Sequence, residues 1–240
     1  GIIGAGSNRM NIYTVSKVSQ GYSNYLKQCF ESPSVAIAYD SRIKSKLFAE
    51  VSAGVFAGNG IKVHIFEELM PTPVLSYAIR KLKCCGGIVI TASHNPANYN
   101  GYKVYGSDGC QITNRAADNI YKHIKAVDEF DDISAIRFEE GLAQGKIKYI
   151  AEDTVTDYIK SISKLGLLPE NVSRDIKIVY TPLNGTGLKC VTRCLEENGF
   201  KNIIIPEQQK EPDGIFATCP YPNPEIQEAL AIGLECARET

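Results

Sequence analysis

The chain has 240 residues, of which 44% are hydrophobic and 22% are charged. This length predicts one or two domains, and the composition excludes a disordered tail, a collagen-like repeat and a heptad rod. With 26 basic and 27 acidic residues, the chain lacks the basic excess of a general nucleic-acid binder. Its apolar stretches are too short to span a bilayer, and no signal peptide opens it, so we expect a cytoplasmic protein.

The first half of the chain alternates short apolar runs with helical patterns. Strands are predicted where β-branched and apolar residues run together, and helices where apolar residues recur every three or four positions. The predicted strands are residues 34–39, 62–66 and 86–91, and the predicted helices are residues 44–58 and 71–82. This order forms right-handed βαβ units, so we expect an α/β fold with mixed, mainly parallel sheets and helices on both faces.

A polar loop after Thr91 leads into a predicted hairpin and a further helix. The hairpin has a Gly-Ser-Asp-Gly turn, which favours pairing of the segments on either side of it. Its parts are residues 102–105, 106–109 and 110–112, and the helix runs from an N-cap at Thr113 to about Val127.

Residues 128–148 are acidic, then glycine-containing, with weak periodicity, so we interpret them as a connector between two domains. A second α/β unit is predicted beyond them, and it ends on a helix that no strand follows. Its elements are an amphipathic helix at 154–165, strands at 176–180 and 202–205, a turn at 182–187, a helix at 188–198 and a last helix from Pro224.

Eight cysteines are many for this length. Without a secretion signal, a reduced set is expected rather than disulfides. A structural metal site would need further ligands at close spacing, such as two CxxC pairs, and the sequence has neither pair. The cysteines are therefore interpreted as buried small hydrophobic residues.

The segment Thr91–Pro96 is the main candidate for chemistry, because it directly follows a buried strand. In open α/β sheets, ligands bind beyond the carboxyl ends of the strands. Ser93 is therefore a nucleophile, a turn residue or a helix cap. Local composition favours a turn, and the chain lacks the GxSxG pattern of an acyl-transfer serine.

Cationic residues from three other chain positions favour a functional role for Ser93 over a simple turn. Arg42 follows another strand, Lys103 lies ten residues beyond Ser93, and Arg9 lies in a glycine-rich segment near the start. If they converge on the serine, they suit phosphate chemistry, because phosphoryl transfer depends on positioning and on neutralising the phosphate oxygens. Taken alone, His94 could instead serve a turn, and Lys103 could be a solvated strand end.

A second glycine turn, Asn184–Gly187, leads into a predicted helix and so has the general form of a phosphate loop. It lacks both the GxxxxGK[ST] and GxGxxG patterns, so a structural turn is favoured.

The stretch Thr91–Ile112 resembles the active-site serine loop of the α-D-phosphohexomutases, the phosphoglucomutase/phosphomannomutase family. The amino-acid sequence of this stretch is most similar to that of the phosphoglucomutase and phosphopentomutase branch. Three further stretches agree, in the family's order: Gly4–Asn11, Ala38–Arg42 and Tyr221–Glu225.

The resemblance implies that Ser93 carries a phosphate in the resting enzyme and transfers it to a sugar monophosphate, giving a bound sugar 1,6-bisphosphate. It implies that Mg²⁺ binds through that phosphate, and that His94 shapes the phosphoserine environment. It further implies an acid/base or phosphate-stabilising role for Lys103, an arginine near the phosphoserine in Arg42, and phosphate binding by Arg9.

The resemblance also implies a domain plan. Residues 1–135 match the family's domain I, and residues 150–240 match a domain II that stops before the aspartate loop holding the metal. Gly1 is not a methionine, so we expect an N-terminal portion of a longer enzyme, with little or no mutase turnover by itself.

Two hypotheses remain open, a phosphosugar mutase and a non-catalytic phosphosugar-binding module. The expected partner is a phosphorylated sugar, with no nucleic acid and no membrane. Glucose phosphate is the leading substrate, ribose, deoxyribose and mannose phosphates stay open, and the oligomeric state is not readable from the sequence.

Overall fold

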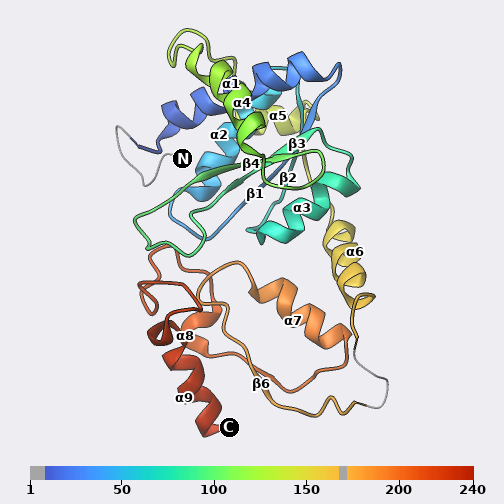
Figure 1. Cartoon of the computed structure of the whole chain (residues 1–240), viewed down its shortest axis with the longest axis vertical. Helices are drawn as coiled ribbons and strands as arrows, with labels where there is room; N and C mark the ends of the chain where they lie inside the picture. Colours follow the sequence, from blue (N-terminus) through green and yellow to red (C-terminus); the bar gives the residue numbers. More distant parts are fainter. Residues whose placement is uncertain (1–8, 168–171) are drawn as a thin grey trace. The chain divides into compact units, whose positions relative to one another are not determined.

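The computed structural model describes residues 9–167 and 172–240 (Figure 1). These residues form two compact units. The first unit contains residues 9–40, 44–92 and 98–150, and the second contains residues 151–167 and 172–240 together with two short segments, 41–43 and 93–97.

The first unit is built on a five-stranded sheet in the order β4-β3-β1-β2-β5. All neighbouring strands are parallel except β4, which runs antiparallel to β3. The expected mainly parallel α/β sheet is therefore confirmed. Its strands are β1 (Ser34–Tyr39), β2 (Lys62–Ile65), β3 (Gly86–Ile90), β4 (Tyr102–Gly106) and β5 (Ile147–Tyr149), and its helices are α1 (Ile12–Cys29), α2 (Ser45–Gly58), α3 (Thr72–Lys81), α4 (Asn114–Lys125) and α5 (Phe138–Ala143).

Adjacent glycines of β3 show that helices cover both faces of the sheet. A Cβ on Gly86 would meet the hydroxyl of Tyr22 in α1, and a Cβ on Gly87 would lie 2.6 Å from Ile79 in α3. Successive strand residues point to opposite faces, so α1 and α3 lie on opposite sides (Figure 1). Between them the sheet contributes fully buried apolar side chains, including Ile37 and Ile88.

Helix α1 has no counterpart among the elements expected from the sequence. Asn11 caps it: its side-chain oxygen accepts from the amides of Tyr13 and Thr14, both at 2.9 Å. The Thr14 hydroxyl accepts from the amide of Asn11 at 3.0 Å, which completes a capping box. The buried face includes Ser19 and Ser23 as well as apolar residues, so its periodicity is hidden in the sequence.

The expected connector at residues 128–148 is wrong, because this segment supplies α5 and the fifth strand of the sheet. It packs on α2, where two glycines allow the backbones to approach. The amide of Ile136 donates to the carbonyl of Gly54 at 3.1 Å, and the Ser134 hydroxyl donates to the carbonyl of Gly58 at 3.0 Å. These contacts join residues distant in sequence, and periodicity within the segment does not reveal them.

The second unit has a two-stranded parallel sheet and four α-helices among the residues that the structure describes. A small core of Leu183, Cys219 and Ala229 lies within it. Its elements are α6 (Glu152–Ser163), β6 (Ile178–Val179), α7 (Leu188–Glu197), β7 (Ile203–Ile204), α8 (Glu207–Lys210), the 3₁₀ helix η1 (Gln227–Leu230) and α9 (Ala231–Glu239).

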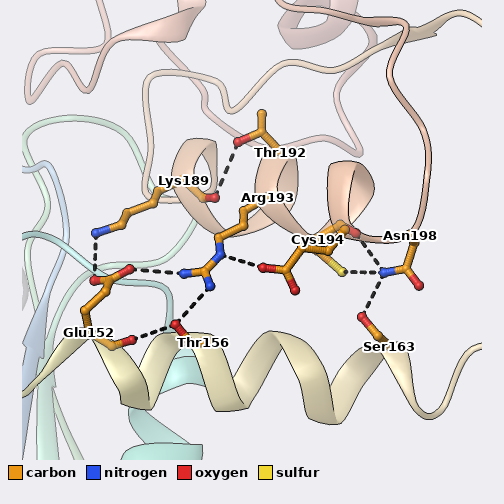
Figure 2. Close-up of polar contacts among 9 residues, drawn as sticks. Glu152, Thr156, Ser163, Lys189, Thr192, Arg193, Cys194 and Asn198 are labelled. Atoms are coloured by element: carbon orange, nitrogen blue, oxygen red, sulfur yellow. Dashed lines mark hydrogen bonds and ion pairs between the residues drawn. The ribbon is translucent and has the colours of Figure 1, made fainter.

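Polar side chains join α6 to α7 (Figure 2). Glu152 accepts from Lys189 at 3.0 Å and from Arg193 at 3.2 Å, and Arg193 also donates to the Thr156 hydroxyl at 2.9 Å. Near the other end of α6, the side-chain amide of Asn198 donates to the hydroxyl of Ser163 at 2.8 Å.

The last helix does not begin at Pro224 as expected. The side-chain oxygen of Asn223 accepts from the backbone amide of Glu225 at 3.0 Å. The backbone carbonyl of Asn223 accepts from the backbone amide of Ile226, also at 3.0 Å. These bonds form a local turn that competes with helix formation, so a 3₁₀ turn and then α9 follow later.

The fold yields a test at two buried helical glycines that differ in the space around them. Where a Cβ has room, replacing a helical glycine by alanine stabilises the helix by about 1 kcal/mol. At Gly54 the new Cβ would meet the carbonyl oxygen of Ile136, so Gly54→Ala should lower the free energy of unfolding by about 1–3 kcal/mol. Urea denaturation followed by circular dichroism measures the change.

Gly233→Ala in α9 is the matched control, because its Cβ would have only an ordinary 3.5 Å contact with Thr181. We expect that variant to be neutral or slightly stabilising. A Gly54→Ala protein as stable as the Gly233→Ala protein would contradict the packing of residues 134–136 on α2.

Candidate phosphate-transfer site

The parallel pairing of β1 and β3 explains how two distant segments meet. Both strands end at the same edge of the sheet, and beyond that edge the amide of Asp40 still donates to the carbonyl of Ile90 at 3.1 Å. The chain then continues into residues 41–43 after β1 and into residues 93–97 after Thr91 and Ala92. The two segments belong to the second unit, where they lie together.

The Arg42 side chain holds the loop that carries Ser93. Only 3% of Arg42 is exposed, and its guanidinium donates to three loop carbonyls: Ser93 at 2.8 Å, Asn95 at 2.5 Å and Pro96 at 2.7 Å. Hydrogen bonds from a charged donor are stronger than neutral ones, and the planar guanidinium can direct several at once. Arg42 therefore positions the serine loop through its backbone.

Ser93 is the first residue of the segment 93–97 and has a left-handed backbone conformation, with φ of 55°. A residue other than glycine adopts this conformation at a cost of about 1 kcal/mol or more, unless its surroundings hold it there. The bond from Arg42 to the Ser93 carbonyl provides that support. The residue itself is exposed, and His94 beside it is exposed as well.

The other two predicted cations belong to the first unit. Lys103 lies on β4, opposite Val89 of β3, and is half-buried. Arg9 is exposed just before α1, and its carbonyl accepts from the Thr14 hydroxyl at 2.8 Å. The structure thus brings Arg42, Ser93 and His94 together within one unit, and it places Lys103 and Arg9 in the other.

A buried polar chain in the first unit fixes the ends of the segments that lead to the site. The Ser45 hydroxyl donates to the Asp40 carboxylate at 2.7 Å and accepts from the Asn100 amide at 2.9 Å. Asn100 also accepts from the amide of Gly101 at 2.8 Å. Sequence reasoning did not single out Asp40, Ser45 or Asn100 as a set, although two of them lie in stretches that it quoted.

The turn Asn184–Gly187 has a structural role, as favoured from the sequence. Asn184 is 4% exposed and has a φ of 56°. Its side-chain amide donates to the carbonyls of Gln208 at 3.3 Å and Glu211 at 2.8 Å, and its side-chain oxygen accepts from Thr218 at 2.8 Å.

No group of three His, Cys, Asp or Glu side chains gathers to hold a metal ion within residues 9–167 and 172–240. The residues present around Ser93 therefore do not form a magnesium site by themselves. The eight cysteines are free thiols, and Cys84, Cys190 and Cys219 are buried as expected. The expectation of burial is wrong for Cys29 and Cys110, which are exposed. In the same described ranges, no helix combines the length and apolar character needed to cross a membrane.

Two family models match the chain. The phosphoglucomutase/phosphomannomutase α/β/α domain I model matches residues 1–131, and the domain II model of the same family matches residues 156–240. The chain belongs to the phosphoglucomutase/phosphomannomutase family.

Curated relatives support this family membership. The chain is 37% identical to a phosphoglucomutase of Staphylococcus saprophyticus over 99% of its own length, and 35% identical to one of Staphylococcus haemolyticus over its whole length. In each case it spans 43% of the relative. A solved Thermus thermophilus protein assigned as a phosphomannomutase matches 98% of this chain and 49% of its own, with a TM-score of 0.80 and 25% identity.

Replacing Arg42 by lysine tests how this phosphohexomutase-family loop is held. Lysine keeps the charge but cannot direct a planar set of donors to three carbonyls. We expect Arg42→Lys to raise amide hydrogen exchange in residues 93–97 by about tenfold, which corresponds to a loss of about 1.4 kcal/mol. Arg115→Lys, at an exposed position of α4, should leave that exchange unchanged. Equal exchange in the Arg42→Lys and wild-type loops would contradict the proposed contact.

Replacing Ser45 by alanine tests the polar chain in the first unit. Ser45→Ala deprives both Asp40 and Asn100 of a buried partner, so the free energy of unfolding should fall by about 1–3 kcal/mol. Ser23→Ala is the matched control, because Ser23 is equally buried in α1 and its hydroxyl donates to the carbonyl of Ser19 in its own helix. Urea denaturation of both variants checks the difference, and equal losses would argue against the chain.

Proposed function

We propose that this chain supplies the phosphate-carrying serine of a phosphosugar mutase, and that Ser93 is that serine. The observation that supports this most is an exposed serine in a left-handed backbone conformation, whose carbonyl accepts a hydrogen bond from a buried arginine. These contacts fix the backbone of the loop and therefore the position of the serine. Pre-positioning of this kind is what phosphoryl transfer mainly requires.

In the proposed reaction, the phosphorus–oxygen bond to Ser93 breaks as a free hydroxyl of the sugar monophosphate attacks. The sugar hydroxyl loses its proton to a general base, for which we propose Lys103. The Ser93 oxygen leaves with the bonding electrons and takes up a proton, so that a free serine hydroxyl and a sugar 1,6-bisphosphate result. The other phosphate then returns to Ser93, which leaves the isomeric monophosphate. We propose that His94 and Arg42 shape the phosphoserine environment and that Arg9 binds phosphate.

The substrate and the metal are part of the same proposal. The curated relatives are named phosphoglucomutases, so glucose phosphate is the proposed substrate. We propose Mg²⁺ as the metal, with the Ser93 phosphate as one ligand and the remaining ligands from the longer protein. Bound Mg²⁺ would neutralise charge on the phosphate. Because the chain spans 43% of these relatives, turnover is proposed for the longer protein, in the cytoplasm, with little expected of this chain alone.

Mass spectrometry tests the role of Ser93. After incubation with glucose 1,6-bisphosphate and Mg²⁺, the full-length protein should gain about 80 Da, one phosphate, on the peptide that contains Ser93. Ser93→Ala should abolish both this phosphate and mutase activity. Ser107→Ala, which removes an exposed hydroxyl in the turn before residue 110, should retain both.

A different outcome would favour the non-catalytic alternative. If Ser93 is never phosphorylated and Ser93→Ala keeps full activity, the mutase mechanism proposed for this serine is wrong. Retained binding of glucose 6-phosphate in that variant, measured by calorimetry, would then indicate a phosphosugar-binding module.

A further inference from the structure

A loop far along the chain, residues 213–217, packs against the segment that carries Arg42. The Arg42 guanidinium lies over the aromatic ring of Phe216. Its carbon atom, Cζ, is 5.1 Å from the ring centroid. Phe216 is 4% exposed, so water does not compete for this cation–π contact. Both residues belong to the second unit, as does the Ser93 loop.

The backbone of the loop indicates that the position of the Phe216 ring is strongly determined. Phe216 has a φ of 49°, the left-handed region, which is unfavourable for a bulky residue. The Asp213 carboxylate holds this shape by accepting from the amides of Ile215 at 3.0 Å and Ala217 at 2.9 Å. The amide of Asp213 in turn donates to the carbonyl of Asn184 at 3.0 Å. Hydrogen bonds to both neighbours of Phe216 in the chain thus fix its backbone.

A glycine in the same loop allows it to approach the Arg42 segment closely. A Cβ added to Gly214 would lie 2.8 Å from the carbonyl oxygen of Ser41 and 2.9 Å from the amide nitrogen of Ile43. Both atoms are backbone, so neither can move aside cheaply. The backbone of residues 41–43 therefore packs closely against the loop 213–217, while the Arg42 side chain binds the serine loop.

We infer that Phe216 is a positioning residue for phosphoryl transfer at Ser93, acting through Arg42. The ring fixes the plane of the guanidinium, and that plane determines which loop carbonyls the guanidinium can reach. The loop 213–217, more than a hundred residues after Ser93, then contributes to the geometry of the serine without contacting its hydroxyl. The catalytic part of this inference rests on the proposed function.

The test combines hydrogen exchange with phosphorylation of the full-length protein by glucose 1,6-bisphosphate. Phe216→Leu removes the ring but keeps an apolar side chain, and it should raise exchange in residues 93–97 five- to tenfold while slowing Ser93 phosphorylation to a similar extent. Phe216→Tyr keeps the ring and should restore both values toward wild type. Ile215→Ala is the control on the same loop, because 58% of Ile215 is exposed.

Gly214→Ala is a second variant that keeps the ring and the core. It should loosen residues 93–97 in the same way, because the loop must move away from residues 41–43. Amides of α7 serve as the internal reference and should not change.

The inference is overturned if residues 93–97 exchange at the wild-type rate in Phe216→Leu, or if α7 loosens equally, which would indicate a general loss of stability. It is also overturned if Phe216→Tyr is as impaired as Phe216→Leu. A different result would refute the proposed function: no phosphate on Ser93 in wild type or any variant, with the exchange differences between variants as predicted. The role of Phe216 in holding the loop through Arg42 would then still be supported.

Discussion

The geometry of the candidate site depends on one buried cation. Arg42 is almost fully enclosed, and a charge taken out of water must find compensating partners. It finds them in three backbone carbonyls of the loop 93–97. The guanidinium therefore lies next to the backbone of Ser93, the residue proposed to carry the phosphate.

Contacts within each unit fix the parts of the chain that carry this cation. In the first unit, parallel pairing of β1 and β3 brings the ends of these strands together, and the chain of Asp40, Ser45 and Asn100 fixes the backbone there. The short segments 41–43 and 93–97 follow strands of the first unit but belong to the second. Within the second unit, Phe216 lies against the guanidinium, so Arg42 contacts a loop that comes much later in the sequence.

Much of this could be predicted from the sequence, because the relevant signals are local. The strands of the parallel sheet are short β-branched runs, and α2 and α3 have clear apolar periodicity, so their positions were confirmed. Ser93 was singled out as a candidate because its loop has a distinctive order of residues. Helix α1 was missed since small buried serines dilute its apolar face, and β5 was missed because its place depends on backbone contacts with the distant Gly54 and Gly58. Phe216 had no local signal, because its significance arises only when residues 174 positions apart meet.

The central claim, that Ser93 carries the phosphate in turnover, is tested most directly by its kinetics in the full-length protein. Rapid-quench measurement after mixing the phosphorylated protein with glucose 1-phosphate gives the rate at which phosphate leaves Ser93. We predict a rate at least equal to steady-state turnover, because an intermediate on the pathway cannot react more slowly than the whole cycle. A phosphate that leaves Ser93 more slowly than product forms would contradict the account.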